Sequence, residues 1–107
     1  MEREEDGANP LDEALIRRLD ALSEEGQDFW HDFDATVRQE RWHSFVAADY
    51  DLVRAALLPL RRPGRPFLEW GSAHGVITIM ADLLGFDACG IEIDPDFLDT
   101  YEPVAAI

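Results

Sequence analysis

The chain has 107 residues, enough for one small domain, and with 47% hydrophobic and 10% aromatic residues it can bury a core. Its 23 acidic side chains stand against 9 basic ones, all arginine, and give a formal charge of −14. Because a field of this sign repels phosphate backbones, we do not expect a nucleic acid as a partner and favour a small molecule or a protein.

The sequence has neither a membrane-spanning run nor a secretory signal. No apolar run reaches the roughly 18 residues that a membrane helix needs. The first residues, MEREEDGANP, are charged and lack the apolar segment of a signal peptide. A single cysteine, Cys89, cannot form an internal disulfide, and its place in an apolar run predicts a buried strand position. We therefore expect a cytoplasmic protein.

Residues 1–44 are predicted to form an acidic α-helical extension. Leucines spaced by three and four residues predict a helix over Leu11–Leu22, and a break is expected at Ser23–Gly26. A second helix is predicted over Gln27–Trp42, with a largely aromatic stripe formed by Phe29, Trp30, Phe33, Val37 and Trp42. We expect these helices to pack on the domain that follows or to cover its crevice. His31 and His43 lack ligand-spaced partners, so no metal site is predicted.

A short helix and a turn lead into the second half of the chain. Asp49 or Asp51 is a candidate cap for a helix over Tyr50–Leu58, which ends before Pro59. Its predicted apolar stripe consists of Val53, Ala56, Leu57 and Leu60. The turn-rich segment RRPGRP follows, and we expect its three arginines to be solvated or to pair with nearby acids.

The stretch PFLEWGSAHGVITIMADLLGFDACGIEIDP predicts one strand–loop–helix–strand unit. The strands are expected over Phe67–Trp70 and Ala88–Ile93, and the helix over Val76–Leu84 with Gly85 at its C-terminal end. A crossover of this length joins parallel strands, so the predicted fold class is α/β. After it, Asp94-Pro95 is expected to start another helix over Phe97–Ile107.

The loop Gly71–Gly75 and Glu92 are predicted to form a nucleoside-binding crevice. A glycine loop at the carboxyl end of a strand lets a ligand approach the backbone, and the next helix offers free N–H groups. Glu92, near the end of the second strand, would point into the same crevice and accept hydrogen bonds from a ribose diol. The interval between Gly71 and Glu92 is close to the roughly 20 residues expected for such a unit.

These residues resemble the first two motifs of class I S-adenosylmethionine-dependent methyltransferases. Glu69-x-Gly71-x-x-x-Gly75 is similar to the acidic-x-Gly-x-Gly-x-Gly motif, and Glu92 matches the acidic residue that holds the ribose. Ala73 replaces the middle glycine, a mild departure provided that its φ is negative. The resemblance implies S-adenosyl-L-methionine as the cofactor, bound by Glu69, Gly71, Ser72, Ala73, Gly75 and Glu92.

The resemblance also implies the fold: residues 45–107 would be the N-terminal part of a Rossmann-like methyltransferase domain, with two parallel strands and a crossover helix. The acceptor, a small molecule or a protein, and the catalytic base would be supplied elsewhere, so the isolated chain is expected to be inactive. It is expected to be loosely packed or to self-associate through the exposed edge of Phe67–Trp70.

Two other functions remain open from the sequence. One is a non-catalytic, truncated domain that binds a nucleoside or a protein partner. The other is a dinucleotide-binding half domain, but its G-x-G-x-x-G pattern would require glycine at positions 73 and 76, where the chain has Ala73 and Val76. His74 is treated as an ordinary loop residue.

Overall fold

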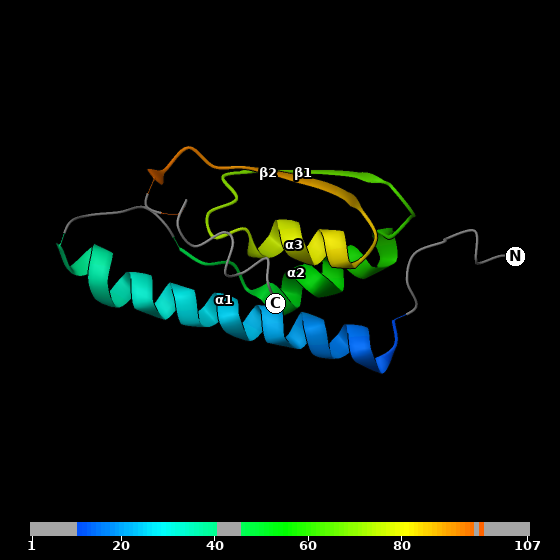
Figure 1. Cartoon of the computed structure of the whole chain (residues 1–107), viewed down its shortest axis with the longest axis horizontal. Coiled ribbons are helices and arrows are strands. Elements are labelled where there is room, and N and C mark those ends of the chain that lie inside the picture. The colour runs from blue at the N-terminus through cyan, green and yellow to red at the C-terminus, as the bar shows by residue number, and fades with distance from the viewer. Residues whose placement is uncertain (1–10, 41–45, 96, 98–107) are drawn as a thin grey trace, which may run out of the picture.

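The computed structural model describes residues 11–40, 46–95 and 97 and shows helices packed against one side of a small sheet (Figure 1). Of the helix predicted over Phe97–Ile107, all but Phe97 lies outside this range, as do Trp42 and His43. The elements in chain order are α1 (Glu13–Glu40), α2 (Tyr50–Leu57), the 3₁₀ turn η2 (Leu58–Leu60), β1 (Pro66–Trp70), α3 (Val76–Leu83) and β2 (Asp87–Ile91).

The predicted strand–loop–helix–strand unit is confirmed. Strands β1 and β2 pair in parallel, with Phe67 opposite Ala88 and Glu69 opposite Gly90, and α3 forms the crossover between them. Gly85 follows α3 with a φ of 101°, the left-handed conformation that commonly ends a helix. The two strands therefore end side by side, at the same edge of the sheet as the Gly71–Gly75 loop.

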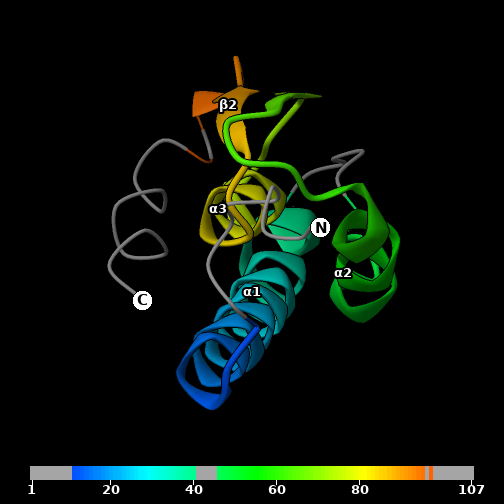
Figure 2. The same ribbon diagram turned by 90° about the vertical axis from the view of Figure 1, so that its right-hand side faces the viewer.

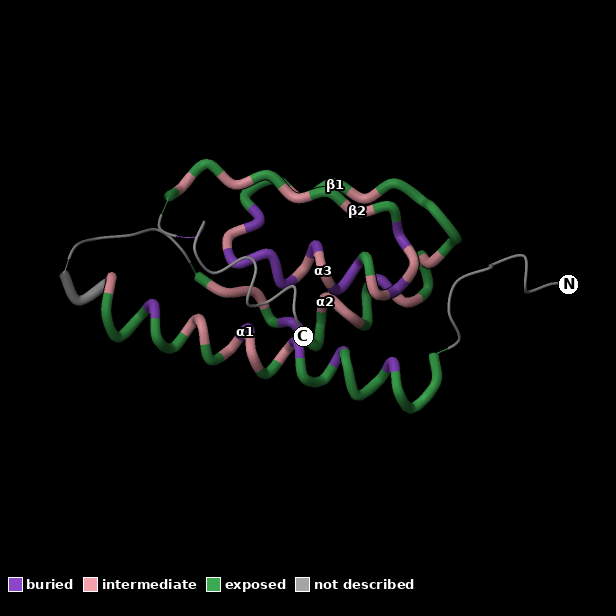
Figure 3. Tube along the Cα trace, in the orientation of Figure 1, coloured by how far each residue is buried: buried purple, intermediate pink, exposed green. Residues whose placement is uncertain are grey.

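In the described part of the chain, the helices cover one face of this sheet and leave the other uncovered. In the end view, α3 lies beneath the strands, α1 beneath α3, and α2 beside both helices (Figure 2). The buried positions of α1 recur on the side toward α3 (Figure 3). One cluster of buried side chains joins these layers: Leu15, Leu19, Leu22, Tyr50, Leu57, Val76, Met80, Ala81, Leu84 and Phe86.

The other face of the sheet is apolar and open among the described residues. Leu68 is 51% exposed, Trp70 76% and Ile93 92%. Cys89, predicted to be buried, is also exposed. Successive strand residues point to opposite faces, and the register that turns Phe67 and Ala88 toward α3 turns Leu68 and Cys89 away from it. Trp70 shares this open face.

The predicted break at Ser23–Gly26 is wrong, because α1 is a continuous helix of 28 residues. Gly26 is a poor helix former, yet it is buried where α1 meets the start of α2 and α3. A Cβ at Gly26 would lie 2.7 Å from Cε2 of Tyr50 and 2.9 Å from Cγ2 of Val76. The glycine therefore serves close packing inside a helix. No helix in the described ranges, α1 included, has the length and apolar character needed to cross a membrane.

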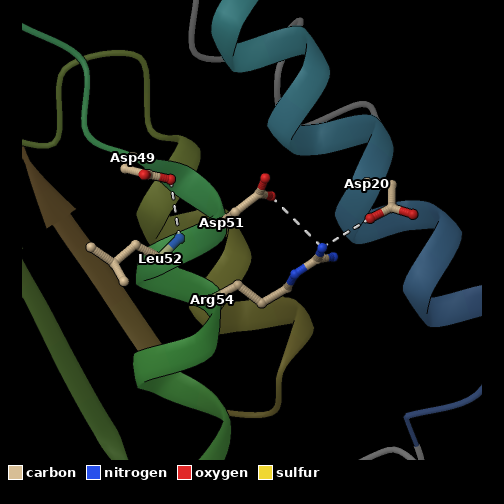
Figure 4. Close-up of polar contacts among 5 residues, drawn as sticks. All are labelled: Asp20, Asp49, Asp51, Leu52 and Arg54. Atoms are coloured by element: carbon tan, nitrogen blue, oxygen red, sulfur yellow. Dashed lines mark hydrogen bonds and ion pairs between the residues drawn. The ribbon is translucent and has the colours of Figure 1, made fainter.

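Polar contacts fix α2 against α1 (Figure 4). Asp49 caps α2 as predicted, since its Oδ1 accepts a hydrogen bond of 3.2 Å from the backbone N–H of Leu52. Arg54 reaches across to α1, with its Nη2 3.0 Å from Oδ1 of Asp20. Tyr50 and Leu57 are the buried residues of this helix. The predicted stripe is thus wrong at Ala56 and Leu60, which are exposed.

The arginines of the Arg61–Arg65 turn donate hydrogen bonds to backbone carbonyls, a role that the sequence did not predict. Arg61 Nε donates to the carbonyl oxygen of Leu84 at 2.8 Å, and Arg65 Nη1 donates to that of Leu60 at 2.7 Å. A cation at the C-terminal end of α3 also suits the helix dipole. This basic turn precedes β1 and so lies at the opposite end of the sheet from the Gly71–Gly75 loop.

We expect the substitution Gly26→Ala to destabilise the protein. In an exposed helix position this change stabilises by about 1 kcal/mol. At Gly26 the added methyl would force Tyr50 and Val76 apart, and overpacking of this kind costs about 1–3 kcal/mol. Urea denaturation measures the change in the free energy of unfolding. The control Ala21→Gly, on the exposed face of α1, measures the effect of helix propensity alone in the same helix. A stabilised Gly26→Ala variant would contradict the packing role.

Candidate functional site

The loop between β1 and α3 is held in place by the end of β2. The backbone N–H groups of Gly71 and Ser72 both donate to the carbonyl oxygen of Ile91, at 2.7 and 2.9 Å. Gly71 and Gly75 have φ values of 69° and 85°, in the left-handed region that favours glycine. A Cβ at Gly71 would meet no atom within 4 Å, so the backbone faces open space there. A ligand could approach the main chain closely at this point.

Glu92 lies against this loop, where the sequence predicted it. Its Oε1 accepts a hydrogen bond of 2.6 Å from the backbone N–H of Ala73, and its Oε2 accepts one of 2.9 Å from that of Asp94. The carboxylate thereby joins the end of β2 to the turn after β1. Each carboxylate oxygen has two acceptor sites, so each keeps capacity for one more hydrogen bond.

A cavity of about 140 Å³ opens beside the loop. Of the six predicted cofactor residues, Glu69, Gly71, Ser72 and Ala73 line it, Gly75 follows as the N-cap of α3, and Glu92 is bonded to Ala73. Ligand pockets commonly measure about 300–1,000 Å³, so this cavity suits one end of a nucleoside cofactor. The remaining lining residues are Val46, Ala48, Tyr50, His74, Val76 and Ile77.

Comparison with known proteins finds a relative with a named activity. Over 76 residues the chain is 33% identical to the ribosomal protein L11 methyltransferase of Thermus thermophilus. This chain is similar to part of a methyltransferase. The match covers 68% of the chain and 30% of that protein, so the chain spans less than a third of its relative's length. No family model matches the chain.

Ala73 departs from the expected backbone geometry. Its φ is +51°, whereas the tolerated replacement of a glycine assumed a negative value. A left-handed alanine costs about 1–2 kcal/mol, because Cβ approaches the following carbonyl oxygen. The hydrogen bond from the Ala73 N–H to Glu92 holds the residue in this conformation. Backbone strain of this kind often marks binding loops.

Glu69 is a half-buried acid at the edge of the cavity. Burial raises its pKa and the charge of Glu92 adds to this rise, while a hydrogen bond of 2.7 Å from the Thr78 hydroxyl to Oε1 of Glu69 opposes it. Tyr50, on the cavity wall, has its pKa raised to about 12, chiefly by burial and further by the charge of Glu69. The cavity thus carries acidic groups, which favours a cationic ligand over an anionic one.

Tyr50 and Thr78 were missed as site residues in the sequence. Tyr50 looked like the first residue of a short helix, and only tertiary structure brings it beside Glu69. Thr78 did carry a signal, because it is a lone hydroxyl within an apolar helical run, VITIMADL. In the described part of the chain no three His, Cys, Asp or Glu side chains are grouped to hold a metal ion.

His74 is more than the ordinary loop residue expected. It is 3% exposed, and its ring lies 5.3 Å from that of Phe29, 6.1 Å from that of Phe33 and 4.9 Å from that of Phe97. Burial lowers the pKa of His74, and the charge of Glu92 acts in the opposite direction. Since Phe29 and Phe33 belong to α1, the long N-terminal helix anchors the loop through this histidine.

We expect Ala73→Gly to leave stability unchanged or to raise it by up to about 1 kcal/mol. Glycine removes the strain of the positive φ, and this gain outweighs or balances the greater chain entropy of the unfolded state. Ala47→Gly in the connector, where φ is not positive, should lower stability by roughly 0.4–1 kcal/mol. Equal losses for both variants in thermal denaturation would contradict a strained Ala73.

Proposed function

We propose that the chain is the N-terminal, cofactor-binding part of a class I methyltransferase that uses S-adenosyl-L-methionine. The observation that carries this proposal is the hydrogen bond that Glu92, directly after β2, accepts from the Ala73 N–H in the turn after β1. It brings an acidic residue and a glycine-containing loop to the same edge of a parallel sheet, where nucleotides bind in open α/β folds. The similarity to a named methyltransferase supports the same function.

The proposed site assigns a role to each part of the crevice. Glu92 accepts hydrogen bonds from the ribose hydroxyls with its remaining acceptor capacity. Gly71, Ser72, Ala73 and Gly75 give the ligand access to the main chain. Glu69 faces the amino-acid end of the ligand in the cavity. The cofactor supplies the activated methyl group, and the protein orients it toward the acceptor.

Charge favours this cofactor over a dinucleotide. A pyrophosphate is an anion and would meet Glu69 and Glu92 at the crevice. The sulfonium and ammonium groups of S-adenosylmethionine are cations and are attracted by the same carboxylates. The loop also lacks the glycines that a tight pyrophosphate turn needs at Ala73 and Val76.

The rest of such an enzyme would complete the sheet and the acceptor site. Among the described residues, β1 pairs with no strand but β2, and the face with Leu68 and Trp70 is uncovered. Further strands and helices would cover these surfaces, and we propose a small molecule or a protein as the acceptor. Alone, the chain should give no methyl transfer and should be loosely packed or self-associate through the Phe67–Trp70 edge.

The first test is the substitution Glu92→Ala. It removes a charge-assisted acceptor worth roughly 1.5–3 kcal/mol, so the affinity for S-adenosylhomocysteine should fall about tenfold or more. Calorimetry or, for weak binding, ligand-detected NMR gives the affinity. The control Asp87→Ala removes an exposed charge at the other end of β2 and should leave the affinity for S-adenosylhomocysteine unchanged.

Glu92→Gln separates the two roles of this side chain. Its amide oxygen can still accept the Ala73 N–H, but the negative charge is lost. We therefore expect a loss of affinity smaller than that of Glu92→Ala, with the loop unchanged. A folded Glu92→Ala variant that binds as tightly as the unmodified chain would contradict the assignment of Glu92 to the ribose.

A further inference from the structure

Thr78 connects the crossover helix to the cavity. It is the third residue of α3, is 4% exposed, and lies in an otherwise apolar stretch of that helix. Its hydroxyl donates a hydrogen bond of 2.7 Å to Oε1 of Glu69, on the neighbouring strand β1. Glu69 in turn lines the cavity beside the loop. The hydroxyl thus lies behind the carboxylate that a ligand would meet.

Strand β2 leaves space for the hydrogen bond between Thr78 and Glu69. Gly90 lies opposite Glu69 in the parallel register. A Cβ at Gly90 would clash with Oγ1 of Thr78 and would lie 2.7 Å from Cβ of Ser72. Only glycine therefore admits both the Thr78 hydroxyl and the loop residue Ser72 at this point. Three elements, β1, α3 and β2, together determine where the carboxylate of Glu69 lies.

We propose that Thr78 is a positioning residue, which holds one oxygen of Glu69 so that the carboxylate binds the ammonium group at the amino-acid end of the cofactor. This inference rests on the proposed function and adds to it a residue that no sequence motif assigned. Glu69 touches the ligand, and Thr78 acts through Glu69.

The electrostatics of Glu69 explain why the hydroxyl matters. Burial raises the pKa of Glu69 and the charge of Glu92 raises it further, whereas hydrogen bonds from the hydroxyl and from the backbone of Thr78 lower it. Without the hydroxyl, the ionised form of Glu69 would lose one of the hydrogen bonds that favour it, and a neutral carboxyl attracts a cation weakly. Loss of the hydroxyl also removes one of the two Thr78 groups that hold the carboxylate in place. Both effects act only on a ligand that carries the ammonium group.

Two ligands and two variants test this inference. S-adenosylhomocysteine carries the amino-acid end, whereas 5′-methylthioadenosine shares the nucleoside and lacks that end. Thr78→Val keeps the shape of the side chain and removes the hydroxyl, and Thr78→Ser keeps the hydroxyl. We expect Thr78→Val to weaken S-adenosylhomocysteine about tenfold or more and to change the affinity for methylthioadenosine less than twofold. Thr78→Ser should restore the lost affinity.

The outcomes distinguish a failure of the proposed function from a failure of the role given to Thr78. If the unmodified chain binds neither ligand, the proposed function fails and the role of Thr78 fails with it. If the chain binds both ligands and Thr78→Val weakens them equally or not at all, the role of Thr78 is wrong and the proposed function stands.

A measurement without ligand gives a second test. The side-chain carboxyl carbon of Glu69 reports its titration by NMR. We expect Thr78→Val to move this titration to higher pH and Thr78→Ser to leave it in place, because only the former removes a hydrogen bond to the ionised form. The pH dependence of S-adenosylhomocysteine binding should shift in the same direction. An unchanged Glu69 titration in a folded Thr78→Val variant would overturn the inference.

Discussion

The parallel pairing of β1 with β2 is the constraint on which the rest of the structure depends. It requires a crossover, which α3 provides, and it brings the carboxyl ends of both strands to the same edge. The Gly71–Gly75 loop and Glu92 follow these strand ends and therefore lie next to each other. The bonds from Gly71 and Ser72 to the Ile91 carbonyl, and from Ala73 to Glu92, follow from this alignment. A shift of the register would separate all of them.

The N-terminal helix contributes to the site from below the sheet. Leu19 and Leu22 of α1 join the core of α3, Gly26 admits the ring of Tyr50, and Phe29 and Phe33 contact His74 in the loop. Tyr50 and His74 both line the cavity. A helix that looks like an extension in the sequence therefore shapes two walls of the candidate site. Its contacts with His74 tie the loop to the core.

The sequence predicted the parts of the fold that depend on local pattern and spacing. The strand–loop–helix–strand order, the Asp49 cap and the approach of Glu92 to the loop are confirmed. The continuity of α1 was missed, because Gly26 is unfavourable locally and is explained only by packing against Tyr50 and Val76.

The burial of the strand residues could not be predicted from the sequence either, since an apolar run does not determine which face of the sheet is covered. Cys89 and Trp70 lie on the open face for this reason. Similarly, the backbone φ of Ala73 and the bond from Thr78 to Glu69 depend on tertiary contacts that no spacing encodes.

Binding of the cofactor at the strand ends is tested most directly by mapping amide chemical shifts of the chain during a titration with S-adenosylhomocysteine. We expect saturable shifts at Gly71–Gly75 and at Asp94, whose N–H groups border the crevice. Amides of the Arg61–Arg65 turn, at the opposite end of the sheet, should stay in place. Saturable shifts centred on that turn, or no shifts at millimolar ligand, would contradict a cofactor site at the loop and Glu92.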